Sequence, residues 1–179
     1  KKIHNLQVFL NSINFFLKRH SISIISIKKK NLNFHSRFDA LERVYEYIIT
    51  NRNSSLALNK NRSWHVKKKI DIKLLKKGAK ILTGKHDFST FRASSCSAKS
   101  PIKKINYIKI IKKDDNIFLE FSSKSFLQNQ VRSMVGCLKY LACKRLNFNE
   151  FKKVFKSKDR RLCSPPAPAH GLYLKKVKY

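Results

Sequence analysis

Acidic side chains are scarce in this chain: its 179 residues contain 10 Asp and Glu against 41 Lys and Arg, a formal net charge of +31 at pH 7. So large an excess opposes compaction unless a polyanion neutralises it, which makes nucleic acid the first partner to consider. Lys is abundant together with Ile, Asn, Phe and Ser, a bias that A+T-rich coding imposes on any protein. The charge is therefore discounted, and by itself it predicts nucleic-acid binding and nothing finer.

Glycine and proline, with four residues each, are too few for a collagen-like or low-complexity chain. The four cysteines are Cys96, Cys137, Cys143 and Cys163. None of them has the C-x-x-C spacing of a zinc or redox site, and we expect reduced thiols in a reducing compartment. No apolar run approaches the ~18 residues that span a bilayer. His65, His86 and His170 have no ligand at suitable spacing, so we expect no metal site.

Hydrophobic residues make up 42% of the chain and can fill a core, and their periodicity indicates the elements. Helices are expected over residues 3–19, 71–82 and 126–138 and from residue 147, and strands over 22–27, 43–49, 102–111, 117–121 and 172–179. Asp71 is a candidate N-cap, and Asn147 with Glu150 has the spacing of a capping box. Strands paired through hairpins, with helices on one face, predict an α+β fold with a mainly antiparallel sheet.

Five short segments combine Arg, His, aromatic and small residues. They are residues 34–38 (FHSRF), 43–47 (RVYEY), 86–93 (HDFSTFRA), 130–136 (QVRSMVG) and 169–174 (AHGLYL). Each has an ordinary structural explanation, since a strand tyrosine such as Tyr45 is more often part of the core or the sheet surface than catalytic. Arg132 is less ordinary, because a charge within an apolar helical stretch is costly unless a carboxylate pairs with it.

Together and in this order, the five segments resemble the bacterial tRNA pseudouridine synthase A family, which isomerises uridines in the tRNA anticodon stem-loop. The resemblance implies the pseudouridine synthase fold, in which two ferredoxin-like halves share one extended antiparallel sheet. Residues 1–33 would then be the remnant of a truncated N-terminal half, and residues 34–179 the C-terminal RNA-binding and catalytic half. It also implies a cytoplasmic homodimer that acts on tRNA without cofactor or metal.

The resemblance assigns roles residue by residue. Tyr45 matches the active-site tyrosine whose ring stacks on the flipped uracil, and whose hydroxyl helps to remove the proton from C5. Arg132 matches the arginine that keeps the catalytic aspartate ionised and aimed at the nucleotide. Gly171 and Leu172 match the closing-strand motif that lines the uracil pocket. The residues expected on the phosphate-binding wall are Arg37, Arg43, Arg92 and Lys99.

The family's nucleophile lies in a Gly-Arg-Thr-Asp-Ala-Gly segment, which does not occur in these 179 residues. We expect this segment to precede Lys1, and the chain as it stands to be inactive. Whether the aspartate attacks the sugar C1′ or the uracil C6 stays open. The alternative hypothesis is a non-catalytic basic RNA-binding protein, a ribosome- or tRNA-associated relic of the family. The five segments argue against a third, a generic DNA-binding domain.

Overall fold

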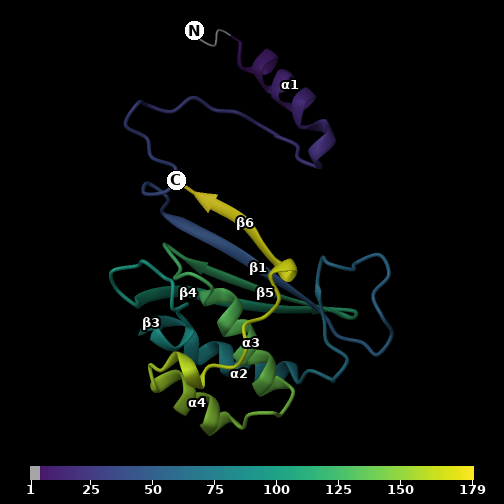
Figure 1. The fold of residues 1–179 in the computed structure, drawn as a ribbon, viewed down its shortest axis with the longest axis vertical. Helices are drawn as coiled ribbons and strands as arrows, with labels where there is room; N and C mark the ends of the chain where they lie inside the picture. Colours follow the sequence, from purple (N-terminus) through teal and green to yellow (C-terminus); the bar gives the residue numbers. More distant parts are fainter. Residues whose placement is uncertain (1–4) are drawn as a thin grey trace. The chain divides into compact units, whose positions relative to one another are not determined.

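The computed structural model describes residues 5–179 (Figure 1). The chain divides into two compact units, residues 1–39 and residues 40–179. No helix among the described residues is long and apolar enough to cross a membrane.

The N-terminal unit contains helix α1 (Leu6–Leu17), which confirms the helix expected there; Ile3, assigned to the same helix, lies outside the described residues. The strand expected over residues 22–27 is wrong. The side-chain amide of Asn14 donates to the carbonyl of Ile24 at 2.9 Å and accepts from its N–H at 2.8 Å. The Asn14 side chain thus forms the two backbone hydrogen bonds that Ile24 would form with a neighbouring strand.

The C-terminal unit is built on a six-stranded sheet (Figure 1). Its strands are β1 (Glu42–Thr50), β2 (Trp64–His65), β3 (Gly84–Asp87), β4 (Ile102–Lys113), β5 (Asn116–Ser123) and β6 (Leu172–Lys178). The order is β2-β1-β5-β4-β3, β6 also pairs with β1, and only the short β1–β2 pairing is parallel. The α+β fold with a mainly antiparallel sheet is therefore confirmed, and β2 and β3 are additional to the strands that the sequence predicts.

Three helices complete this unit: α2 (Ile72–Leu82), α3 (Gln130–Ala142) and α4 (Phe148–Lys156). The caps at Asp71 and at Asn147 with Glu150 are confirmed. Helix α3 begins four residues later than the apolar pattern predicts. Asn129 has a left-handed backbone with φ 59°, which interrupts the helix on its N-terminal side.

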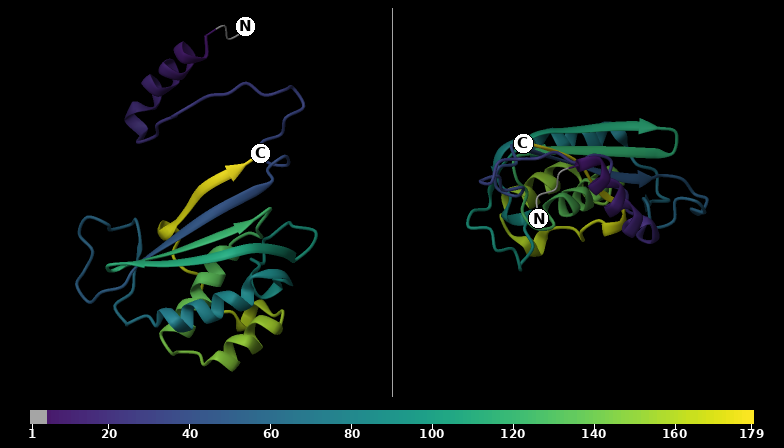
Figure 2. Two further views of the ribbon diagram at one scale, coloured as in Figure 1. Left: turned by 180° about the vertical axis from the view of Figure 1, so that it is seen from behind. Right: turned by 90° about the horizontal axis from the view of Figure 1, so that it is seen from above.

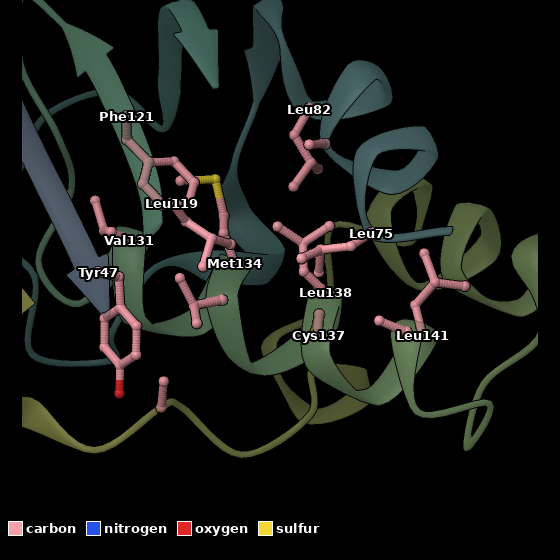
Figure 3. Packing of buried hydrophobic residues seen from close by; sticks show 14 of the residues in the cluster. Tyr47, Leu75, Leu82, Leu119, Phe121, Val131, Met134, Cys137, Leu138 and Leu141 are labelled. Atoms are coloured by element: carbon pink, nitrogen blue, oxygen red, sulfur yellow. The ribbon is translucent and has the colours of Figure 1, made fainter. Parts of the chain in front are cut away.

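The core of the C-terminal unit lies between one face of the sheet and the helices. Figure 2 shows α2, α3 and α4 on the same side of the sheet. Residues 45, 47 and 49 of β1 point to that side, because side chains alternate along a strand. Figure 3 shows Tyr47, Leu119 and Phe121 from the strands packed toward Met134 of α3. This packing places the helix-facing side chains of β1 beside the first turns of α3.

Candidate functional site

Tyr45 lies near the middle of β1, between Phe121 of β5 and Leu174 of β6. Its half-buried ring meets Phe126 edge to face, with 5.3 Å between the ring centroids and an interplanar angle of 87°. Phe126 belongs to the turn that leads into α3. Tyr45 therefore lies on the helix-covered face of the sheet, next to the segment that introduces Arg132.

Tyr47, two residues further along β1, is a site residue that the sequence analysis did not single out. Its ring is fully buried and its hydroxyl donates a hydrogen bond of 2.7 Å to the carbonyl of Pro168. Figure 3 shows this hydroxyl pointing at the segment that precedes β6. Burial raises the pKa of Tyr47 far above its ordinary value, against a smaller opposing effect of the charge on Arg132. The hydroxyl therefore stays protonated and acts as a fixed donor.

Arg132 lies in the first turn of α3 and is bound to neutral acceptors. Its Nε donates to the carbonyl of Ala167 at 2.7 Å, and its Nη1 donates to Oδ1 of Asn129 at 3.3 Å. The backbone N–H of Ala167 donates in return to the carbonyl of Arg132 at 2.9 Å. None of the ion pairs within residues 5–179 includes Arg132. The carboxylate that its position calls for is therefore not supplied by the described part of the chain.

Two glycines allow the segment 165–171 to lie close against β1 and α3. A Cβ on Gly171 would come within 2.8 Å of the Tyr47 ring, and one on Gly136 within 2.1 Å of the carbonyl oxygen of Pro165. Leu172 follows as the first residue of β6, half-buried and opposite Tyr47 in the β1–β6 register. Leu172 and Tyr45 thus lie on the paired strands β6 and β1, Arg132 binds Ala167 at one end of the segment 167–171, and Gly171 at its other end lies against Tyr47.

The four residues expected on a phosphate wall differ in their contacts and exposure. Arg43 donates to the carbonyl of Lys124 at 2.5 Å. Arg92 donates to the carbonyls of Cys96 and Ala98 at 2.6 and 2.8 Å, and so holds its own loop together. Lys99, at the end of that loop, is exposed, and Arg37 is an exposed residue of the N-terminal unit.

The acidic side chains of the central strands point away from this region. Glu46 of β1 and Glu120 of β5 share the ammonium group of Lys175, at 2.8 and 2.7 Å. The hydroxyl of Tyr107 donates to Glu120 at 2.8 Å, and the hydrogen bond from Lys175 lowers the pKa of that carboxyl below its usual value. Glu42 binds Lys178 and Ser122 in the same manner. Glu42 and Glu46 occupy even positions of β1, so they lie on the face opposite Tyr45.

Comparison with known proteins identifies the family of this chain. Residues 79–179 match the model of a family described as tRNA pseudouridine synthase. The tRNA pseudouridine synthase A of Pelagibacter ubique is 56% identical over 179 residues, which are 100% of this chain and 73% of that protein. The proteins of the same name from Caulobacter vibrioides and Ehrlichia canis are each 41% identical, over 97% and 96% of this chain and 70% of their own lengths. The family match covers more than half of the chain and the identities extend along nearly all of it, so the chain belongs to the tRNA pseudouridine synthase family.

Proposed function

We propose that this chain supplies the base-stacking tyrosine, the aspartate-orienting arginine and the uracil-facing strand of an enzyme that isomerises uridine to pseudouridine in the anticodon stem-loop of tRNA. The observation that carries the proposal is the environment of Arg132. Two neutral oxygens hold its guanidinium beside Tyr47 and the segment before Leu172, and no carboxylate of residues 5–179 pairs with it.

Arg132 fits the role of orienting an aspartate. A guanidinium offers a rigid fork of donors that matches a carboxylate, and its charge keeps that carboxylate ionised at neutral pH. Because Ala167 and Asn129 engage Nε and Nη1, Nη2 is left for such a partner. The resemblance places the aspartate in the Gly-Arg-Thr-Asp-Ala-Gly segment, so that segment would complete the site.

Tyr45 fits the role of stacking on the flipped base. A uracil that leaves the RNA stack needs an aromatic face in place of its lost neighbours. Phe126 supports the Tyr45 ring from one edge and limits its rotation. The aspartate carboxylate attacks the nucleotide at C1′ or at C6 and the glycosidic bond to N1 breaks. The uracil then rejoins C1′ of the ribose through C5, and the bond to the aspartate breaks, which restores the free carboxylate. The proton on C5 then leaves, and we assign its removal to the hydroxyl of Tyr45.

Positive side chains would bind the RNA phosphates. Lys99 and Arg37 have exposed side chains, and the guanidinium groups of Arg43 and Arg92 donate to backbone carbonyls of Lys124 and of Cys96 and Ala98. Binding of this kind releases counterions, so we expect the affinity for tRNA to fall steeply as the salt concentration rises.

The homodimer, the cytoplasmic location and the domain boundary between residues 33 and 34 stay predictions.

The proposal can be tested by completing the site. The match to the Pelagibacter ubique relative leaves about 27% of that protein uncovered, and a chimera can join this remaining part to the present chain. We expect the chimera to form pseudouridine in unmodified tRNA, measured by carbodiimide labelling and primer extension, and the chain alone to form none.

Matched variants show whether this chain provides catalytic groups. Tyr45→Leu in the chimera should remove product formation, while Tyr140→Leu, a change in a partly exposed ring near the end of α3, should leave it nearly unchanged. Activity retained by Tyr45→Leu would contradict the assignment. A chimera that folds and binds tRNA but forms no pseudouridine would favour the non-catalytic RNA-binding protein.

A further inference from the structure

Two cysteines that are distant in the sequence lie side by side in the fold. Cys137 of α3 and Cys163, which follows the 3₁₀ turn Arg160–Leu162, have their sulfur atoms 3.5 Å apart, and both are free thiols. Cys137 is fully buried, while Cys163 is partly exposed. Because 26 residues separate them, the search for closely spaced cysteines in the sequence could not detect this pair.

The surroundings of the pair favour a thiolate at Cys137. Its sulfur accepts a hydrogen bond of 3.3 Å from the backbone N–H of Ser164 and lies within hydrogen-bonding distance of the sulfur of Cys163. The contact with Cys163, helped by the hydrogen bond from Ser164 and by the charge of Arg160, lowers the pKa of Cys137 below its ordinary value. The same pairing raises the pKa of Cys163. A thiolate is the form of cysteine that reacts with oxidants.

The remaining two cysteines differ from this pair. Cys143, at the end of α3, is buried without a sulfur partner, and burial raises the pKa of its thiol. Cys96 is also buried, in the loop that Arg92 holds together. Cys96 and Cys143 therefore serve as internal controls for the reactivity of Cys137 and Cys163.

We propose that Cys137 and Cys163 form a peroxide-sensitive dithiol site, which a hydroperoxide converts to a disulfide. In the first step the Cys137 thiolate attacks one oxygen of hydrogen peroxide, the O–O bond breaks, and the departing hydroxide takes up a proton to become water. Cys137 is then a sulfenic acid. In the second step the Cys163 sulfur attacks the Cys137 sulfur, the S–O bond breaks, and a second water leaves. Two thiols are oxidised and one peroxide is reduced to two waters.

This disulfide would act on the segment that Arg132 holds. Cys163 begins the stretch that continues through Pro165 and Ala167, where the carbonyl of Ala167 accepts from Arg132. A covalent bond from Cys163 to α3 would tie the start of this stretch to the helix that carries Arg132. Oxidation should therefore make the segment 163–171 more resistant to proteolysis.

The test uses the chain alone and needs neither tRNA nor activity, so its outcome is independent of the proposed function. The protein is treated with a slight excess of hydrogen peroxide, remaining thiols are alkylated, and peptides are identified by mass spectrometry. We expect one disulfide, between Cys137 and Cys163, that dithiothreitol reverses, with Cys96 and Cys143 alkylated.

Variants separate the pair from general thiol oxidation. Cys163→Ser should leave Cys137 as a sulfenic acid that dimedone traps, whereas Cys143→Ser should form the disulfide as the unchanged chain does. Cys163→Ala repeats the dimedone measurement with a different replacement of Cys163, and circular dichroism checks that each variant is folded. Alkylation of both Cys137 and Cys163 after peroxide treatment, or a disulfide to Cys96 or Cys143 in the folded chain, would overturn the proposal.

Discussion

Strand β1 presents two contrasting faces. On the face away from the helices, Glu46 and its neighbour Glu120 both meet the ammonium group of Lys175. On the helix-covered side, Arg132 donates to the carbonyl of Ala167 and to Oδ1 of Asn129, and none of the ion pairs of residues 5–179 includes it. Acidic residues are few in this chain, and the two on β1, Glu42 and Glu46, each form an ion pair with a lysine of β6. Within residues 5–179 the charge on Arg132 forms no ion pair, and it lies close enough to Tyr47 to affect the pKa of that residue.

The two faces also differ in how closely they are packed. The helix-covered face holds the segment 165–171 through buried hydrogen bonds and glycines that leave no room for a side chain. The other face holds its charges through partly exposed ion pairs, which contribute at most about 1 kcal/mol each because water screens them. Substitutions on the two faces should therefore have very different costs.

The largest effect is expected from Gly136→Ala. Its Cβ would lie 2.1 Å from the carbonyl oxygen of Pro165, a backbone atom that cannot move alone. We expect the free energy of unfolding to fall by about 3 kcal/mol, measured by urea denaturation. Gly78→Ala is the matched control, because the close neighbours of its Cβ are the side-chain ends of Leu138 and Leu141, at 2.9 and 2.6 Å, and the Phe151 ring lies at an ordinary 3.7 Å. Equal stability losses in the two variants would show that the segment 165–171 is not closely held.

A smaller effect is expected from Tyr47→Phe. The change removes only the hydroxyl, so the ring stays packed while the carbonyl of Pro168 loses its donor. We expect a loss of about 1–2 kcal/mol in the free energy of unfolding. Hydrogen exchange should also become faster at the backbone amides of residues 169–172. Unchanged exchange there would mean that the hydroxyl does not hold this segment.

The smallest effect is expected from Lys175→Met on the opposite face. The ammonium group lowers the pKa of Glu120, so its stabilisation is present above the ordinary carboxyl pKa and is lost as the pH falls through the lowered one. We expect a loss below about 1 kcal/mol at pH 7, which high salt reduces. Thermal unfolding of the variant and the unchanged chain should converge in acid. A difference that persists in acid would point to lost packing instead of lost charge pairing.

Much of the architecture follows from the sequence, since the strands and helices of residues 40–179 have clear hydrophobic periods and caps. The predicted strand over residues 22–27 fails because β propensity does not reveal whether a partner strand exists, and here Asn14 satisfies the backbone of Ile24. The start of α3 is misplaced because Phe126 and Leu127 continue the helical spacing, although the left-handed backbone of Asn129 stops the helix.

The candidate site was only partly accessible from the sequence. Tyr45 and Arg132 were predicted from the resemblance of their segments to a family, and those roles stay predictions. The contact of Tyr47 depends on a hydrogen bond between residues 121 positions apart. Alternation along β1 could have indicated that Tyr47 shares a face with Tyr45. Nothing in the sequence indicates that the hydroxyl reaches Pro168, because that contact depends on how the segment before β6 folds back.

The central claim is that Arg132 holds a catalytic carboxylate and contributes little to RNA affinity. It is tested most directly by comparing Arg132→Lys with Arg145→Lys in the chimera, measuring pseudouridine formation and tRNA affinity on the same samples. Lysine keeps the charge but lacks the planar fork, so Arg132→Lys should lower the rate by about a hundredfold or more while the Kd changes only a few fold. Arg145→Lys, at an exposed position, should change neither. An unchanged rate in Arg132→Lys, or a fall that the loss of tRNA affinity fully explains, would contradict the account.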